Sequence, residues 1–238
     1  RSIVVCVRRY GKYRLPPEPV GHIGRNYLAD RRLKACPDYA MPREMTAALR
    51  DLGLKVKRGG TPDRVAAARA GAAQILRNGF AYHEDAGSWL NISTWRVDAA
   101  LAPDDPTFEC PCPENCQACM QQCPTAAITA PYIMRMDKCI AYLTYHAPEP
   151  VPEELWQKMG PWIYGCDKCQ EVCPLNTGKW SEIEPAPWLE DVKNYLSPAA
   201  LAEMDAETYR NLIHPLFWYI PEDDLARWHR NARRAVAR

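Results

Sequence analysis

The sequence predicts an α+β fold: a small α/β module, then a cysteine-rich module, then a short helical C-terminal part. Three observations predict it. Strand-like and helix-like segments alternate over the first hundred residues. Nine of the 11 cysteines fall between Cys110 and Cys173. Two amphipathic helical patterns follow the last cysteine. We therefore expect three units, at 1–105, 106–180 and 181–238.

The first unit shows both helical and extended patterns. Pro42 stands near the start of one helical pattern and Gly53 follows its end, which is the usual asymmetry of helix termini. Thr61, followed by Pro62, is a helix N-cap signal before an Ala-rich stretch. We expect strands over 2–7, 54–57 and 89–94, and helices over 42–52 and 65–76.

The prolines between 103 and 106 mark the start of the second unit. That segment is rich in proline and has few long periodic stretches, so it cannot build a conventional core and is expected to be held by metal centres. After the prolines at 185 and 187, amphipathic patterns predict helices over 196–212 and 223–236.

Composition excludes several classes of protein. The chain has 238 residues and a formal net charge of +1, from 30 basic and 29 acidic residues, which gives no global field for nucleic acid. The basic stripe at 227–234 is interpreted as a solvated helix face. No apolar run of about 20 residues predicts a membrane span. The N-terminus has no secretory signal pattern, so we expect a cytoplasmic protein. The first residues have the pattern of a β-strand and lack an initiator Met, so we expect that residues are missing upstream.

The cysteines form a duplicated motif. The runs Cys116–Pro124 and Cys166–Pro174 both read C-x2-C-x3-C-P. In two-cluster ferredoxins the cysteine before the proline ligates the other cluster, while the earlier cysteines bind their own. The pattern therefore predicts two 4Fe–4S clusters with crossed ligation and an electron-transfer role.

Each cluster needs four thiolates, so each run needs one further ligand. Cys139 supplies it for the second run. For the first run the candidates are Cys110 and Cys112, because Pro113 stands where the usual spacing would place a cysteine; we choose Cys112. The predicted ligand sets are Cys112, Cys116, Cys119 and Cys173 for one cluster, and Cys123, Cys139, Cys166 and Cys169 for the other.

Two alternatives were weighed for these cysteines. Disulfides are disfavoured because the cysteines are clustered as C-x-x-C pairs in a chain without a leader. A pair of structural zinc sites would use the C-x-x-C pairs but does not need the C-x3-C-P crossing pattern. Cys6 and Cys36 have no partner at metal-ligand spacing, and we expect buried or spare thiols there.

The second half of the cysteine segment resembles the epoxyqueuosine reductase family. The resemblance rests on the stretches 137–144, 152–155 and 163–170 and on the spacings between Cys123, Cys139 and Cys166. It is strong over about 70 residues and continues weakly through 227–232. That family is cytosolic and is related to the reductive dehalogenases.

The resemblance implies a nitroreductase-like, corrinoid-binding N-terminal module and a ferredoxin-like cluster module, with base-off cobalamin between them. Electrons would enter at the outer cluster from a ferredoxin or flavodoxin type of donor, pass to the inner cluster and reduce the cobalt. Tyr142, Ile163 and Tyr164 fall where the family lines its corrinoid pocket, and packing beside the cluster is the alternative role for them.

The N-terminal half departs from the family pattern. Asn26 replaces an Asp in the segment 24–27, and 58–62 has no acid where the family carries its proton-donating Asp. Asp63 follows Pro62 and is interpreted as support for the first helical turn. Opening an epoxide requires a general acid, so another substrate is expected. A tRNA partner is not expected, because of the net charge and because the chain ends before the family's tRNA-gripping helical repeats.

Three functions remain open from the sequence. The first is a corrinoid-dependent reductase acting on a small molecule, with Tyr27, Tyr82 or His83 as possible proton donor. The second is a two-cluster electron carrier that serves a separate corrinoid protein or enzyme. The third is a cobalamin-binding or cobalamin-reducing module without a substrate of its own. All three require the clusters, and the first and third also require bound cobalt.

Overall fold

The computed structural model describes residues 1–30 and 33–237. Its N-terminal part is built on a three-stranded sheet with the order β1-β6-β3. Both pairings are antiparallel, and β1 and β6 are in register from Ser2 opposite Val97 to Arg9 opposite Leu90. The strands are β1 (Ser2–Arg9), β6 (Leu90–Val97) and β3 (Val56–Arg58).

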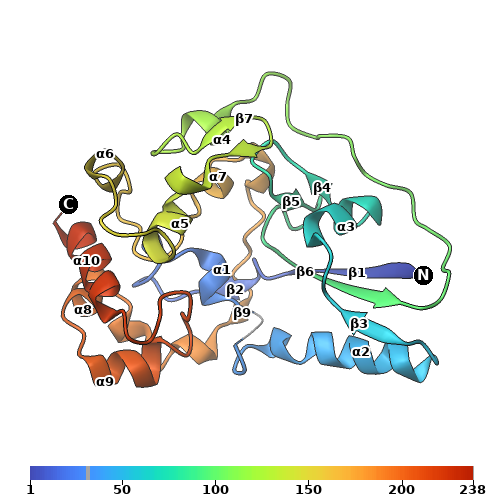
Figure 1. Ribbon diagram of the computed structural model, residues 1–238, viewed down its shortest axis with the longest axis horizontal. Helices are drawn as coiled ribbons and strands as arrows, with labels where there is room; N and C mark the ends of the chain where they lie inside the picture. Colours follow the sequence, from blue (N-terminus) through green and yellow to red (C-terminus); the bar gives the residue numbers. More distant parts are fainter. Residues whose placement is uncertain (31–32, 238) are drawn as a thin grey trace.

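Two helices cover the two faces of this sheet, and the alternation of side chains along β1 decides which residues each helix meets. Val4 and Cys6 pack with Leu49 on the face covered by α2 (Met41–Asp51), and Trp95 is fully buried there. Val5 and Val7 pack on the opposite face against Ala67 of α3 (Asp63–Arg69). Figure 1 shows the sheet between the two helices.

One expectation for this part differs from the structure. The strands and helices alternate as expected; the sheet they form is antiparallel, and β6 inserts between β1 and β3. The Ala-rich helix ends at Arg69 rather than at residue 76. The chain turns at Gly71, which has a φ of +66°, and β4 (Gln74–Ile75) then pairs with β5 (Ala81–Tyr82).

The cysteine segment consists of short elements joined by turns. It begins after a long extended stretch that arches over the molecule from the end of β6 (Figure 1). Its largest apolar cluster is centred on Ile140, Met159 and Trp162. The elements are α4 (Ala118–Gln121), β7 (Ile128–Ala130), β8 (Ile133–Met134), a 3-10 turn (Met136–Lys138), α5 (Ile140–Tyr145), α6 (Glu153–Trp156) and α7 (Lys168–Glu171).

The C-terminal part returns to the beginning of the chain. Strand β9 (Glu184–Pro185) pairs in parallel with β2 (Tyr13–Arg14), and α10 (Leu225–Val236) buries Trp228, whose ring stacks on that of Tyr164 at 5.1 Å. The expected helix over 196–212 is split, because Asp205 caps a new helix. The pieces are α8 (Pro198–Ala202), α9 (Ala206–Thr208) and a π-helical turn (Tyr209–Ile213).

The largest core combines both ends of the chain with the cysteine segment. Tyr13, Ile23, Tyr164, Phe217 and Trp228 are all essentially inaccessible to solvent within it. Helix α1 (Arg25–Leu28) lies at its edge and carries Tyr27. Among the described residues, no helix combines the length and the apolar character that crossing a membrane requires.

Candidate metal centre and adjoining cavity

Four of the predicted ligand cysteines border one small cavity: Cys123, Cys139, Cys166 and Cys169. Two of the sulfurs accept hydrogen bonds from the main chain, because the amide of Ala127 lies 3.2 Å from Cys123 Sγ and that of Lys168 lies 3.4 Å from Cys166 Sγ. Amide donors of this kind stabilise charge on a thiolate. The structure thus gathers the set expected for the second cluster.

The other predicted set is also gathered, although more loosely. Cys119 interacts electrostatically with Cys116 and Cys173. Cys112 packs beside Cys173 in an apolar cluster with Leu76 and Tyr82. Cys110 instead interacts electrostatically with Tyr132 and Cys112. The placement favours Cys112 over Cys110 beside Cys173, and the ligand roles themselves stay predictions.

The chemistry of these thiols fits iron–sulfur clusters. All 11 cysteines are free. Burial raises the pKa of Cys139, Cys166 and Cys169, so bare thiolates would be unfavourable there and need a metal's positive charge. Within the described part of the chain, no three Cys, His, Asp or Glu side chains converge on a single ion position. Four thiols border one cavity, which matches the one thiolate per iron of a 4Fe–4S cluster.

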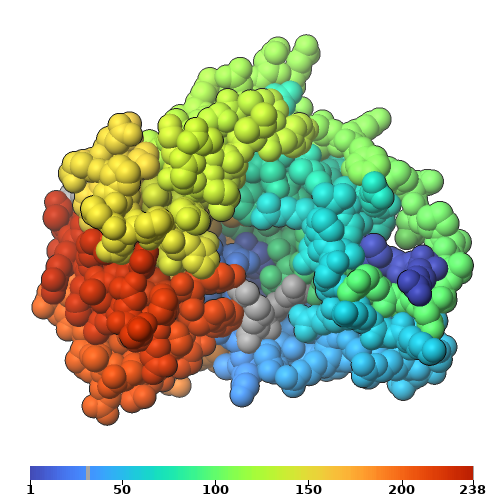
Figure 2. Space-filling model, viewed as in Figure 1, coloured from blue at the N-terminus to red at the C-terminus, as the bar shows by residue number. Residues whose placement is uncertain are grey.

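A cavity of about 410 Å³ adjoins the second set of thiols. The cysteine segment contributes Cys139, Cys166 and Cys169 to its wall, and the N-terminal part contributes both apolar side chains and polar ones, Arg64 among them. Segments from both parts surround a hollow in Figure 2, where the yellow-green chain around α5 faces the teal chain of α3 to β5. This volume lies in the range of small-molecule sites. The apolar contributors are Phe80, Leu90 and Ile92.

Two phenols border the cavity as a hydrogen-bonded pair. The hydroxyls of Tyr27 and Tyr145 lie 2.8 Å apart, and both residues line the wall. Tyr27 is held by Gly165, whose φ is +75° and where a Cβ atom would lie 2.2 Å from the Tyr27 ring. Gly165 also donates its amide to Thr144 Oγ1 at 2.9 Å. Gly165 therefore fixes the position of Tyr27 beside the Cys166 turn.

A buried acid also borders the cavity. Asp167, between two of the predicted ligands, is 2% exposed. It accepts hydrogen bonds from the Arg25 amide at 2.8 Å and from the Arg25 guanidinium at 3.2 Å. Burial raises the pKa of Asp167 to about 6, against the opposing effect of Arg25. The sequence analysis assigned no role to Asp167. Its position between the two cysteines of a C-x2-C turn is the sequence feature that could have indicated one.

The three predicted corrinoid-pocket residues are not among those that line this cavity. Ile163 and Tyr164 are 0% exposed in the main core, and the Tyr164 hydroxyl accepts a hydrogen bond from the Tyr219 amide at 2.9 Å. Tyr142 packs against the apolar cluster of α5 and α6. Their observed contacts are those of core packing, and their role toward a corrinoid stays a prediction.

The other candidate acids occupy different surroundings. Tyr82 is 3% exposed and packs beside Cys173. His83 is close to the surface, with Nδ1 3.9 Å from an Asp85 carboxylate oxygen. Asp63 lies in the first turn of α3, where its carboxylate accepts a hydrogen bond from Thr94 Oγ1 at 2.8 Å. Of the three sequence candidates for proton donor, Tyr27 is the one that borders the cavity.

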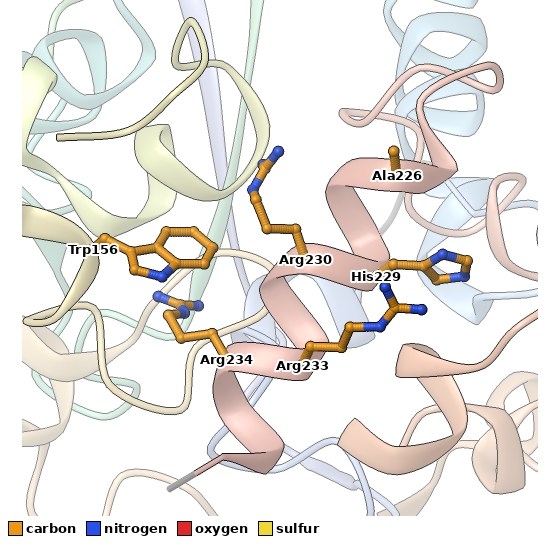
Figure 3. Close-up of a pocket in the computed structure, with 6 residues that line it drawn as sticks. All are labelled: Trp156, Ala226, His229, Arg230, Arg233 and Arg234. Atoms are coloured by element: carbon orange, nitrogen blue, oxygen red, sulfur yellow. The ribbon is translucent and has the colours of Figure 1, made fainter. Parts of the chain in front are cut away.

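A second pocket, of about 390 Å³, lies along α10, with Trp156 and three arginines on its wall (Figure 3). The Arg234 guanidinium lies 4.6 Å from the centroid of the Trp156 ring, and that of Arg230 lies 5.6 Å from it. Arg230 also forms an ion pair with Glu149, and Arg233 donates to the Ala202 carbonyl at 3.3 Å. These guanidinium groups are engaged in holding α10 to its neighbours.

Comparison with known proteins places this site in context. Residues 112–176 match the family described as "4Fe-4S double cluster binding domain". An epoxyqueuosine reductase of Yersinia pestis is 42% identical over 114 residues, which is 48% of this chain and 27% of that protein. The aligned part is thus well under two thirds of the relative's length.

Solved structures extend the similarity to 99% of this chain. One is an epoxyqueuosine reductase from Bacillus subtilis, with a TM-score of 0.74 and 24% identity, of which 64% is covered. Another is an epoxyqueuosine reductase solved with an epoxyqueuosine-modified tRNA stem loop, with a TM-score of 0.75, 25% identity and the same 64% coverage. The chain therefore spans somewhat less than two thirds of these structures.

Proposed function

Because this chain belongs to the epoxyqueuosine reductase family, we propose that it is an iron–sulfur oxidoreductase that passes electrons through two 4Fe–4S clusters to a bound corrinoid. The clusters would be held by the two cysteine sets described above. A bound corrinoid would supply a cobalt centre that receives these electrons and delivers them to a substrate. A ferredoxin or flavodoxin type of protein is the proposed electron donor.

The observation that carries the proposal is the position of the 410 Å³ cavity. Three thiols of the second cysteine set border it directly, so a cofactor bound there would be in contact with the cluster. Apolar residues of β5 and β6 form part of the wall on the side of the N-terminal part, and apolar surroundings shift the potential of a cluster. The cavity is only partly enclosed, so a large ligand can extend from it.

Tyr27 is the proton donor that we propose for the reaction. Reductive cleavage of a bond leaves negative charge on the departing atom, and a proton from the Tyr27 hydroxyl would neutralise it. Burial raises the pKa of Tyr27, so the phenol carries its proton at neutral pH. The Tyr145 hydroxyl, 2.8 Å away, would return a proton to it.

Metal analysis tests the proposal. The protein is purified without oxygen with cobalamin supplied, and its iron, its cobalt and its EPR spectrum are measured. We expect roughly eight iron atoms per chain and the cobalt signal of a base-off corrinoid. Iron without affinity for cobalamin would leave the electron-carrier function, and zinc in place of iron would contradict both.

A variant pair locates the corrinoid. Leu90→Trp would place a large side chain in the cavity wall, and we expect it to lose cobalt while keeping its iron. Arg96→Trp adds the same side chain at an exposed position of the same strand and should keep both metals. Equal cobalt binding by the two variants would place the corrinoid elsewhere.

The substrate is proposed to be a small molecule other than epoxyqueuosine. The support is the stretch 58–62, which carries no acid. Incubation of the metal-loaded protein with epoxyqueuosine-modified RNA and a low-potential reductant is expected to give no queuosine. Formation of queuosine would show that a residue outside 58–62 supplies the proton. It would also show that epoxyqueuosine-modified RNA is a substrate.

A further inference from the structure

A buried glutamine lines the cavity, and its neighbours fix its orientation. Gln170 lies in α7, is 3% exposed and belongs to the cavity wall. Asn176 Oδ1 accepts from the Ser88 amide at 2.8 Å, so Asn176 Nδ2 is the group that donates to Ser88 Oγ at 2.8 Å. The Ser88 hydroxyl then gives its own proton to Gln170 Oε1, also at 2.8 Å.

This arrangement leaves the amide nitrogen of Gln170 for the cavity. Gln170 Nε2 forms no hydrogen bond with any residue that the structure describes. It is not sealed inside the protein either, and the surface that Gln170 presents lies on the cavity wall. An unpaired donor on an otherwise buried side chain is unfavourable. The cavity therefore suits a ligand with an acceptor oxygen at this point.

A guanidinium group lines the same cavity. Arg64, in the first turn of α3, donates from Nη1 to the Gly79 carbonyl at 2.8 Å, and its guanidinium carbon lies 4.6 Å from the centroid of the Phe80 ring. Among residues 1–30 and 33–237, no carboxylate forms an ion pair with it. The acid on this wall, Asp167, is paired with Arg25 at 3.2 Å. Arg64 thus keeps a positive charge and several N–H donors for a ligand.

The two donors belong to one stretch of the wall. A single turn contacts both of them, because the Gly79 carbonyl accepts from Arg64 while Asn78 Nδ2 donates to the Cys169 carbonyl at 3.1 Å. Cys169 directly precedes Gln170 in α7. The packing of the N-terminal part against the second cysteine run therefore brings a charged donor and a neutral donor to the same side of the cavity.

We propose that the cavity binds an organic carboxylate, with Arg64 and Gln170 as donors to its oxygens. A guanidinium presents paired N–H groups that match the two oxygens of a carboxylate. The apolar side chains of Phe80, Leu90 and Ile92 would contact the body of the molecule. The inference rests on the proposed function and names its class of substrate. The carboxylate serves recognition and takes no part in the bond that is cleaved.

Binding of benzoate tests the inference. Benzoate is titrated calorimetrically into the protein loaded with iron and with any cobalamin that it takes up. We expect benzoate to bind and uncharged benzamide, which has the same shape, to bind much more weakly. Arg64→Leu should weaken benzoate binding by about 10–100-fold. Arg69→Leu, at an exposed position of the same helix, should leave it unchanged.

Two results of this titration would overturn the inference. The first is equal affinity of the wild-type protein for benzoate and benzamide, or no affinity for either. The second is an Arg64→Leu variant that binds benzoate as tightly as the wild-type protein, since Arg64 would then serve only the wall or the cluster beside it.

A second variant tests the glutamine. Gln170→Glu keeps an oxygen that can accept from Ser88 and removes the amide donor, so benzoate binding should be lost while the iron content is kept. Gln121→Glu makes the same change at an exposed position of α4 and should bind benzoate normally. Unchanged benzoate binding by Gln170→Glu would contradict the assignment of Gln170. If Gln170→Glu loses iron, the Arg64 variants decide the matter.

The other source of an anion at Arg64 would be the corrinoid itself. Cobalamin carries a phosphodiester that cobinamide lacks, so an Arg64→Leu variant that loses affinity for cobalamin but not for cobinamide would overturn the inference. Wild-type protein that binds benzoate but no cobalamin would contradict the corrinoid of the proposed function alone. Wild-type protein that binds cobalamin but no benzoate would contradict the carboxylate site alone.

Discussion

Three residues offered as possible proton donors have different roles once their surroundings are known. Tyr27 borders the cavity and is hydrogen-bonded to Tyr145. Tyr82 is buried beside Cys173, and its hydroxyl accepts a hydrogen bond from Asn78 Nδ2 at 2.9 Å. His83 is near the surface beside Asp85. The chemistry of a side chain is the same in all such positions, so burial and partners decide which of them can meet a substrate.

Removal of the Tyr27 hydroxyl should slow the reaction without affecting cofactor loading. Tyr27→Phe keeps the ring contacts with Tyr164 at 4.9 Å and with Tyr219 at 5.8 Å, so we expect normal iron and cobalt content. Loss of a general acid lowers the turnover rate by about 10²–10⁴-fold, measured as single-turnover reduction of an accepted substrate.

The control for this prediction is the neighbouring phenol. Tyr145→Phe should have a smaller effect than Tyr27→Phe, because Tyr145 is proposed only to return the proton. A Tyr27→Phe variant that retains the full rate would exclude the phenol as donor and would direct attention to Asp167.

Helix α10 is the element that joins the C-terminal part to the cysteine segment. Asn231 is fully buried and donates from Nδ2 to the carbonyls of Thr144, at 2.9 Å, and Ile163, at 3.0 Å. Trp228, one turn earlier, stacks on Tyr164. One helix thereby fixes both α5 and the turn that leads to Cys166, and so supports the wall of the cavity.

Asn231→Ala should destabilise the protein measurably. The substitution leaves two buried carbonyls without this donor, which costs about 1–3 kcal/mol of the free energy of unfolding. We expect a lower midpoint in anaerobic thermal unfolding monitored by circular dichroism. Asn211→Ala, at an exposed position, is the matched control and should change the midpoint little. Equal midpoints for the two variants would argue against this role of Asn231.

The two parts of the molecule are expected to differ in how much their folded structure depends on the clusters. The N-terminal sheet has a helix on each face, and both contacts are apolar. The segment from Cys110 to Met134 contains short elements and few buried apolar side chains, among them Ala127 and Ile128. Its ordered structure is therefore expected to come largely from metal–thiolate bonds.

Iron removal should loosen that segment first. After anaerobic chelation, limited proteolysis should cut within 106–135 much faster than in the loaded protein, while 2–97 is cut at a similar rate. Mass spectrometry of the fragments gives the cleavage sites. Uniform sensitivity along the chain would show that the clusters hold the whole molecule. Unchanged sensitivity everywhere would show that packing alone holds the segment.

The sequence by itself determined the chemistry of the cysteine segment. Thiol spacing is a local property, so C-x2-C-x3-C-P and the crossed grouping could be read from residue order, and the structure places the cysteines in the same two groups. The signals for the helix boundaries near Pro42 and Gly53 are also local in the sequence, and α2 ends within one residue of the expected position.

The tertiary structure alone decided what surrounds those thiols. The insertion of β6 between β1 and β3, the approach of Tyr27 to Gly165 and the packing of Tyr82 beside Cys173 all join residues far apart in the chain. No local pattern encodes such contacts, because they result from how separately formed elements pack. Cysteine spacing therefore predicts the metal centres, whereas the cavity and the groups that face them follow from the packing of the two parts.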